Sequence, residues 1–217
     1  MNILEKGAFI HIYHQLYDRY GPQHWWPADS AFEMMIGAIL IQNTNWKNVE
    51  KALSNLKPFM DPKRMDKLSL NELAELIRPS GYYNIKAERI KNFLSWFKGY
   101  DYNLDNLMKK TRQDLRNELL HIKGIGKETA DVIILYALNK EAFIVDAYAR
   151  RLFSRLGFDM PHSYDDFQEI VEREFPKDVQ LFNEFHALIV EHGKVHCKIK
   201  PICEGCPLIS ICRRRLK

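Results

Sequence analysis

The stretch Lys123-Gly124-Ile125-Gly126-Lys127-Glu128-Thr129-Ala130 decides how this sequence is interpreted. Apolar residues with helical spacing lie on both sides of it, so the two glycines are predicted to turn the chain between two helices. A Gly-x-Gly turn exposes backbone N–H groups that can hold a phosphate. Its small residues also let another backbone approach closely. The alternative is an ordinary helix–helix turn without a ligand.

The composition is that of a globular protein with one substantial core or two small ones. The 217 residues are 46% hydrophobic and 28% charged, and no apolar run is long enough to span a membrane. The N-terminus fits neither a signal peptide nor a targeting peptide. We therefore expect a monomer in the cytoplasm, associated with the nucleoid, without a membrane partner.

A net charge of +4 and a pI of 8.8 permit binding to a polyanion but do not require it. Basic residues gather near the C-terminus, where a solvated tail and a phosphate contact are equally good interpretations. They are Lys194, Lys198, Lys200, Arg213, Arg214, Arg215 and Lys217.

Helical periodicity runs through the chain. Phe9 to Tyr20 form an amphipathic pattern that Gly21-Pro22 stops, and Ser30 and Glu33 form a capping box that opens the next helix. Convincing strands with period two and hairpin turns are missing. The sequence therefore predicts an all-α protein, with further helices at roughly 45–57, 69–78, 84–98, 111–121, 127–138, 146–156, 164–174 and 179–192.

The hairpin, the later Ile144-Val145-Asp146 step and the C-terminal cysteines together resemble the helix-hairpin-helix glycosylases of the endonuclease III superfamily. The resemblance implies two helical lobes with a DNA-binding cleft. Residues 28–138 would form a helical barrel lobe ending in the hairpin, and 1–27 with 139–217 a second lobe carrying the catalytic aspartate and the cluster loop. The partner would be double-stranded DNA with damaged bases, and the hairpin contacts would be Lys123, Gly124, Gly126 and Lys127.

Asp146 is the catalytic candidate that this resemblance implies. Breaking an N-glycosidic bond builds positive charge on the sugar, which a carboxylate can stabilise while it orients water. The alternative role is that of an N-cap, because a helix is predicted to follow directly.

Glu128 occupies the position where strand-cleaving members of the superfamily keep a Schiff-base lysine. Lys127 cannot simply replace that lysine, because one step along a helix turns a side chain by about 100 degrees. We therefore predict a monofunctional glycosylase without lyase activity that uses water as its nucleophile.

Four segments resemble the bacterial 3-methyladenine DNA glycosylase branch of the superfamily: 24–27, 42–46, 78–84 and 123–128. In that branch the residues that match Trp25, Pro27 and Trp46 enclose the alkylated base. Electron-rich rings suit a cationic base such as 3-methyladenine, since cation–π stacking contributes about 0.5 to 2 kcal/mol. The ordinary alternative for each tryptophan is a place in the core.

Gln42 and Tyr82 match positions that distort DNA in this branch. Gln42 would fill the space left by the flipped nucleotide, and Tyr82 would act as a wedge. Their alternatives are a polar group at a helix end and a packed aromatic ring.

The four cysteines lie within the last twenty-one residues, at a spacing typical of one metal site rather than of disulfides. The superfamily carries a [4Fe-4S] cluster here, although its common first gap has six residues and the gap between Cys197 and Cys203 has five. Zinc is the competitor. The ligands would be Cys197, Cys203, Cys206 and Cys212, and the loop would carry Lys198 and Lys200 toward a DNA backbone. His192 and His196, which flank it, are expected to be structural.

Two other functions stay open. One is an endonuclease III-like glycosylase for oxidised pyrimidines or for mismatched uracil or thymine. The other is a non-catalytic helix-hairpin-helix DNA-binding protein in which Asp146 is only a cap.

Overall fold

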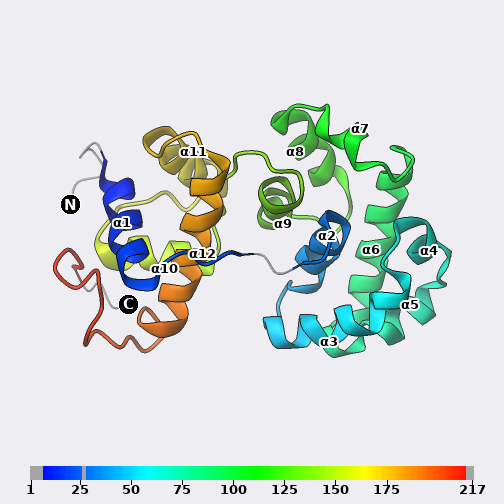
Figure 1. Ribbon diagram of the computed structural model, residues 1–217, viewed down its shortest axis with the longest axis horizontal. Coiled ribbons are helices and arrows are strands. Elements are labelled where there is room, and N and C mark those ends of the chain that lie inside the picture. Colours follow the sequence, from blue (N-terminus) through cyan, green and yellow to red (C-terminus); the bar gives the residue numbers. More distant parts are fainter. Residues whose placement is uncertain (1–6, 26–27, 214–217) are drawn as a thin grey trace. The chain divides into compact units, whose positions relative to one another are not determined.

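The structure, a computed structural model, describes residues 7–25 and 28–213. Every regular element within these ranges is a helix (Figure 1), which confirms the predicted all-α class. The chain divides into two compact units, a terminal unit of Met1–Trp25 with Glu141–Lys217 and a central unit of Trp26–Lys140. None of the helices in the described part is both long and apolar enough to cross a membrane.

Polar residues cap the first turns of several short helices in the central unit and fix where these helices begin. Ser30 Oγ accepts the N–H of Glu33, and Ser69 and Glu72 form a complete capping box. Asp61 caps a helix that begins with Pro62, a residue favoured at that position. The elements are α2 (Ala31–Leu40), α3 (Trp46–Leu56), η1 (Lys57–Phe59), α4 (Pro62–Lys67), α5 (Leu70–Leu76), η2 (Arg78–Ser80), α6 (Tyr83–Lys98), α7 (Leu104–Met108), α8 (Arg112–His121), α9 (Lys127–Val132) and η3 (Ile133–Ala137).

Helix α2 is an almost entirely apolar element of the central unit. Its large apolar residues Phe32, Met35, Ile36, Ile39 and Leu40 are at most 5% exposed. Burying a side chain of this size stabilises the folded state by about 1.5–3 kcal/mol. Helices α3, α6 and α9 and the η3 turn pack around α2, so α2 holds the second helix of the hairpin within the unit.

The terminal unit is held by an aromatic core. Its helices are α1 (Ala8–Tyr20), α10 (Ala147–Leu156), α11 (Tyr164–Glu174) and α12 (Val179–Val195). Phe185 of α12 stacks on Phe175, with ring centroids 4.8 Å apart, and meets Phe143 at 6.0 Å. Aromatic pairs contribute about 0.5–1.5 kcal/mol beyond their buried area, so these contacts fix the position of α12 within the unit.

Three local features differ from the sequence prediction. The helix expected over 127–138 is α-helical only to Val132 and continues as the π-helical turn η3. Helices α4 and α7 were not predicted, because six and five residues are too few to show a period of 3.6.

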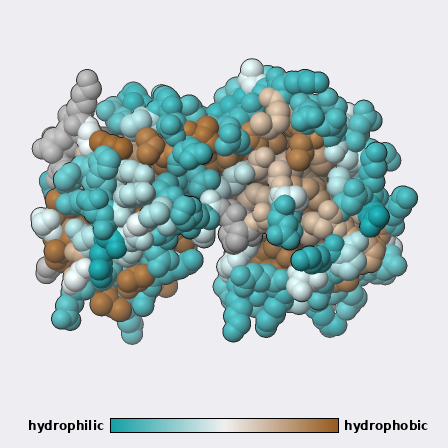
Figure 2. Space-filling model, in the orientation of Figure 1, coloured by the Kyte–Doolittle hydropathy of each residue, from teal (hydrophilic) through white to brown (hydrophobic). Residues whose placement is uncertain are grey.

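Figure 2 shows hydrophilic residues over most of the visible surface of each unit, as expected when apolar stripes are buried.

Candidate functional site

The hairpin connects α8 to α9 and leaves its polar tip open to solvent. Ile122 and Ile125 are 7% and 5% exposed and anchor the loop, and the N–H of Ile125 donates to the Ile122 carbonyl at 3.0 Å. Between and beyond these anchors Lys123, Gly126, Lys127 and Glu128 are exposed and Gly124 is half-buried. The backbone N–H groups of the first turn of α9 therefore lie next to two lysines, an arrangement that suits a phosphate.

Gly124 is the residue that makes this turn possible. Its φ is +99°, in a region that residues with a Cβ rarely adopt. A Cβ added there would lie 2.3 Å from Cγ of Arg89. Gly126 differs, because its φ is −93° and a Cβ added to it would have no atom within 4 Å. Gly124 is therefore needed for the backbone conformation of the turn, whereas Gly126 leaves the backbone at the tip of the loop without a side chain over it.

Gln42 ties the end of α2 to the hairpin. Its Nε2 donates to the Gly124 carbonyl at 3.2 Å and to Thr129 Oγ1 at 2.8 Å, while Arg89 of α6 donates to its Oε1. The side chain predicted to enter DNA therefore has hydrogen-bond partners within the central unit.

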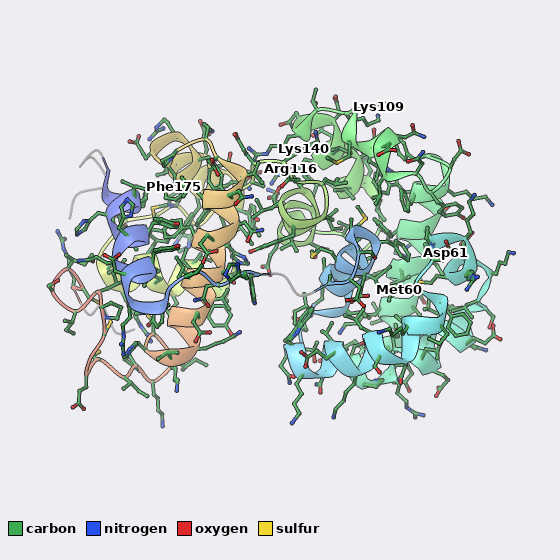
Figure 3. The ribbon with its side chains drawn as sticks, viewed as in Figure 1. Met60, Asp61, Lys109, Arg116, Lys140 and Phe175 are labelled. Carbon is green, nitrogen blue, oxygen red and sulfur yellow. The ribbon has the colours of Figure 1, made fainter. Side chains whose placement is uncertain are left out.

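A buried ion pair that the sequence analysis missed holds α8 against α9. Arg116, labelled in Figure 3, binds Asp131 through both carboxylate oxygens, with Nε–Oδ1 at 2.8 Å and Nη2–Oδ2 at 3.2 Å. The two side chains are 12% and 0% exposed. Such forked pairs are geometrically specific, so this one fixes the angle of the hairpin. Its fifteen-residue separation gives no periodic signal.

Lys86 is a second buried cation that the sequence did not indicate. Its Nζ donates to the carbonyls of Leu40 and Ser80 at 2.8 and 2.6 Å, and burial lowers the pKa of its ammonium to about 8. Leu40 ends α2 just before Gln42, and Ser80 lies just before Tyr82. Lys86 therefore joins the two segments predicted to distort DNA.

Tyr82 projects from the surface of the central unit. It is 67% exposed and adopts a left-handed conformation, with φ +48°, at the N-cap of α6. Gly81 before it also has a positive φ, +67°. An exposed aromatic ring on a constrained turn is the arrangement that a wedge requires.

Trp46 begins α3 and is half-buried beside acidic side chains. Asn45 caps the helix by accepting the N–H of Asn48 at 3.1 Å. The ring of Trp46 lines an open groove of about 230 Å³ in the central unit, with Asp29, Glu33, Glu50, Leu53, Ser54 and Lys57 as its other lining residues. Lys57 Nζ lies 3.8 Å from Asp29 Oδ2, and both side chains are largely solvated. Lys57 can neutralise only one of the three carboxylates, so the groove keeps a net negative charge.

Asp146 and Trp25 lie in the terminal unit. Asp146 is 9% exposed and caps α10, since its Oδ1 accepts the N–H of Ala149 at 2.7 Å. Trp25 contacts His186 of α12, with ring centroids 5.6 Å apart, and Lys194 Nζ lies 5.5 Å from the ring of Trp25. The predicted pocket residue Pro27 lies outside the described residues.

The four cysteines surround one small apolar cavity of about 30 Å³ in the terminal unit. All four are thiols rather than disulfides. Arg155 Nη1 contacts Cys197 Sγ at 3.3 Å and the Lys198 carbonyl at 2.5 Å, and Arg151 Nε donates to the Cys197 carbonyl at 2.6 Å. Within residues 7–25 and 28–213, no three potential ligands are close enough together to hold a metal ion.

The chemistry of this loop nevertheless fits a thiolate-bound metal. Burial raises the pKa of the Cys206 thiol, and the other three cysteines raise it further. Thiols that share a cavity and oppose one another's ionisation are the kind of group that a metal cation deprotonates. Lys198 and Lys200 are both exposed beside it. His192 and His196 are buried and bonded to Tyr20 and the Ile202 carbonyl.

Comparison with known proteins agrees with this arrangement. Residues 36–177 match the family described as HhH-GPD superfamily base excision DNA repair protein. A protein of Methanocaldococcus jannaschii named as a candidate DNA repair glycosylase is 49% identical over 207 residues, which cover 93% of this chain and 94% of that protein.

Two solved structures are similar over most of the chain. The 3-methyladenine DNA glycosylase of H. pylori bound to 1,N6-ethenoadenine has a TM-score of 0.75 at 32% identity, covering 86% of this chain and 97% of that one. A non-covalent endonuclease III–DNA complex has a TM-score of 0.82 at 25% identity, covering 97% and 96%. The chain therefore belongs to the HhH-GPD superfamily of base excision DNA repair proteins, as a helix-hairpin-helix DNA glycosylase of the endonuclease III superfamily.

Proposed function

We propose that this protein is a monofunctional glycosylase that removes alkylated purines such as 3-methyladenine from double-stranded DNA. Glu128 carries the monofunctional part of the proposal. It is exposed on the first turn of α9, at the position where lyases of the superfamily place their lysine. A carboxylate cannot form a Schiff base with the opened sugar, so water remains as the nucleophile.

The charge around the candidate pocket residues supports an alkylated purine. Methylation at N3 makes adenine cationic, and the ring of Trp46 lines a groove with three carboxylates, those of Asp29, Glu33 and Glu50. A negative groove with an electron-rich ring favours a cation over a neutral base. The similarity to the H. pylori glycosylase points to the same class of lesion.

Asp146 would act directly on the sugar. Its Oδ1 accepts an N–H at the N-terminus of α10, which leaves Oδ2 to stabilise the positive charge that builds on the sugar as the base departs and to orient water. A base that is already cationic needs no protonation before it leaves. The N-cap and the catalytic role are therefore compatible, because they use different oxygens.

The proposed DNA contacts come from both units. The hairpin residues Lys123, Gly124, Gly126 and Lys127 would bind a phosphate, and the exposed ring of Tyr82 would wedge into the duplex. Gln42 would enter the space left by the flipped base. Lys198 and Lys200 would contact the backbone. We propose a monomer of two lobes, 28–138 and 1–27 with 139–217, that binds double-stranded DNA with damaged bases.

The four cysteines are proposed to bind a [4Fe-4S] cluster, with zinc as the competing metal. The cluster would fix the loop's fold, and Arg151 and Arg155, bonded to the loop as described, would offset its negative charge. Iron and sulfide in the purified protein would support the cluster, and zinc alone would contradict it.

The decisive experiment incubates the protein with methylated DNA, identifies the released bases, and assays strand breaks without added alkali. We expect release of 3-methyladenine without breaks and no borohydride-trapped complex. Asp146→Asn should bind the same DNA without excision. Glu128→Lys places an amine at the position where lyases of the superfamily keep their lysine. Strand cleavage by the unmodified protein would refute the monofunctional assignment.

An endonuclease III-like activity on oxidised pyrimidines is the second candidate, because the endonuclease III complex is similar over 97% of this chain. The same assay should therefore include oligonucleotides with 1,N6-ethenoadenine, an oxidised pyrimidine, and uracil or thymine opposite guanine. Excision restricted to oxidised pyrimidines would favour the second candidate over the first.

A further inference from the structure

His186 is a buried histidine with no role in the site described so far. It lies in the middle of α12 and is 4% exposed. Its neighbour Phe185 packs on Phe143, Phe153 and Phe175. The imidazole is therefore held on a rigid helix rather than on a mobile loop, which is what precise positioning of a second group requires.

The imidazole faces the oxygen of Asp146 that the helix cap does not use. His186 Nε2 lies 3.5 Å from Asp146 Oδ2, whereas Oδ1 takes the N–H of Ala149. The two side chains are 5% and 12% exposed, so water screens this contact weakly. A distance of 3.5 Å is long for a hydrogen bond, but catalytic contacts in free enzymes often shorten when substrate binds.

The other neighbour of His186 is Trp25, whose ring centroid is 5.6 Å away. His186 thus contacts both the proposed catalytic carboxylate and a proposed base-pocket ring, and all three lie in the terminal unit. A side chain in this place can couple the orientation of the carboxylate to the presence of a base.

We infer that His186 is a positioning residue for Asp146. Its Nε2–H donates to Oδ2 and, with the helix cap on Oδ1, holds the carboxylate in the orientation that excision needs. A neutral imidazole with its proton on Nε2 can make this bond, and so can a protonated one. The inference rests on the proposed role of Asp146 but not on the identity of the lesion.

The test measures single-turnover excision and DNA affinity for His186→Leu and His186→Gln, on whichever lesion the unmodified protein removes fastest. Leucine removes the donor, whereas the glutamine amide keeps one at a similar reach. We expect His186→Leu to slow excision by about 10- to 100-fold, the range expected for a misplaced catalytic group. DNA affinity should change less than about twofold, and His186→Gln should recover most of the rate. His14→Leu, an exposed histidine of α1, is the control.

A second comparison asks whether His186 acts through Asp146. The slow residual excision that Asp146→Asn retains in long single-turnover incubations should not fall further when His186→Leu is added, since the two changes disable one function. Wild-type excision by His186→Leu while Asp146→Asn is inactive would overturn the inference and leave the proposed function standing. Equal losses in both His186 variants, with a lowered melting temperature, would show a packing role and also overturn it. Full excision by Asp146→Asn would refute the catalytic site itself and with it this inference.

Discussion

Replacing Gly124 by alanine tests whether the hairpin depends on a conformation that only glycine adopts easily. The backbone at Gly124 has φ +99°. An added Cβ would also lie 2.3 Å from Cγ and 2.8 Å from Cδ of Arg89, closer than real Cβ contacts come. Alanine therefore meets both backbone strain and a steric clash.

The strain sets the size of the effect. Forcing a residue with a Cβ into a sparsely populated positive-φ region lowers the free energy of unfolding by about 1–3 kcal/mol. The clash adds less, because the aliphatic stem of Arg89 can move, but moving it disturbs the hydrogen bond from Arg89 to Gln42. For a chain of this size, 1–3 kcal/mol corresponds to a fall in melting temperature of roughly 3–10 °C.

Gly126→Ala is the matched control two residues away. With φ −93° and no atom within 4 Å of the added Cβ, alanine should change stability by no more than a few tenths of a kcal/mol, because the restricted unfolded chain offsets the poorer N-cap that alanine makes for α9. Thermal unfolding followed by circular dichroism compares the two variants, and a DNA titration at fixed salt reports phosphate binding. If Gly126 approaches a phosphate, its variant loses affinity without losing stability. An unchanged melting temperature in Gly124→Ala would refute the argument.

Three further changes test other parts of the structure. Lys86→Met should destabilise the central unit by about 1–3 kcal/mol, because two buried carbonyls lose their donor. Burial lowers the pKa of folded Lys86 to about 8 from 10.5, so between these values the unfolded chain binds one proton more and stability rises with pH. Urea unfolding at pH 7 and pH 10 should show that rise in the unmodified protein and a smaller one in the variant. Arg116→Met leaves the fully buried Asp131 carboxylate without its guanidinium and should cost about 3–5 kcal/mol, partly recovered by adding Asp131→Asn; equal stability of both variants in the same urea assay would contradict the pairing argument. Lys194→Met removes a cation 5.5 Å from the ring of Trp25, and we expect it to raise excision of a cationic lesion relative to a neutral one in a competition assay; an unchanged ratio would show that Trp25 does not hold the base.

The features that the sequence predicted are those that depend on residues close together along the chain. The hairpin follows from a glycine pair between two apolar runs, and the burial of α2 follows from the apolar run that ends at Leu40. Caps such as Ser30 and Asp146 depend on residues three positions away, so their partners lie within the same short stretch.

The parts that the sequence did not predict depend on pairs distant along the chain. Lys86 meets the carbonyl of Leu40 across 46 residues, and His186 faces Asp146 across 40. A lysine or histidine within a helical pattern is usually solvated or part of the core, and only the packed structure shows which carbonyl or carboxylate it faces. The same limit applies to the four cysteines, whose spacing identifies a shared site without fixing where the sulfurs lie.

Gln42 has a role that the sequence predicted and contacts that the sequence did not predict. Its match to a position of the 3-methyladenine glycosylase branch makes it a candidate to enter DNA, yet its amide already binds Gly124, Thr129 and Arg89. Entering the duplex would require these hydrogen bonds to be exchanged for bonds to bases, and such an exchange costs little only if each lost bond is replaced. The Gly124 carbonyl belongs to the hairpin, so its bond from Gln42 joins the side chain proposed to enter the duplex to the element proposed to bind a phosphate.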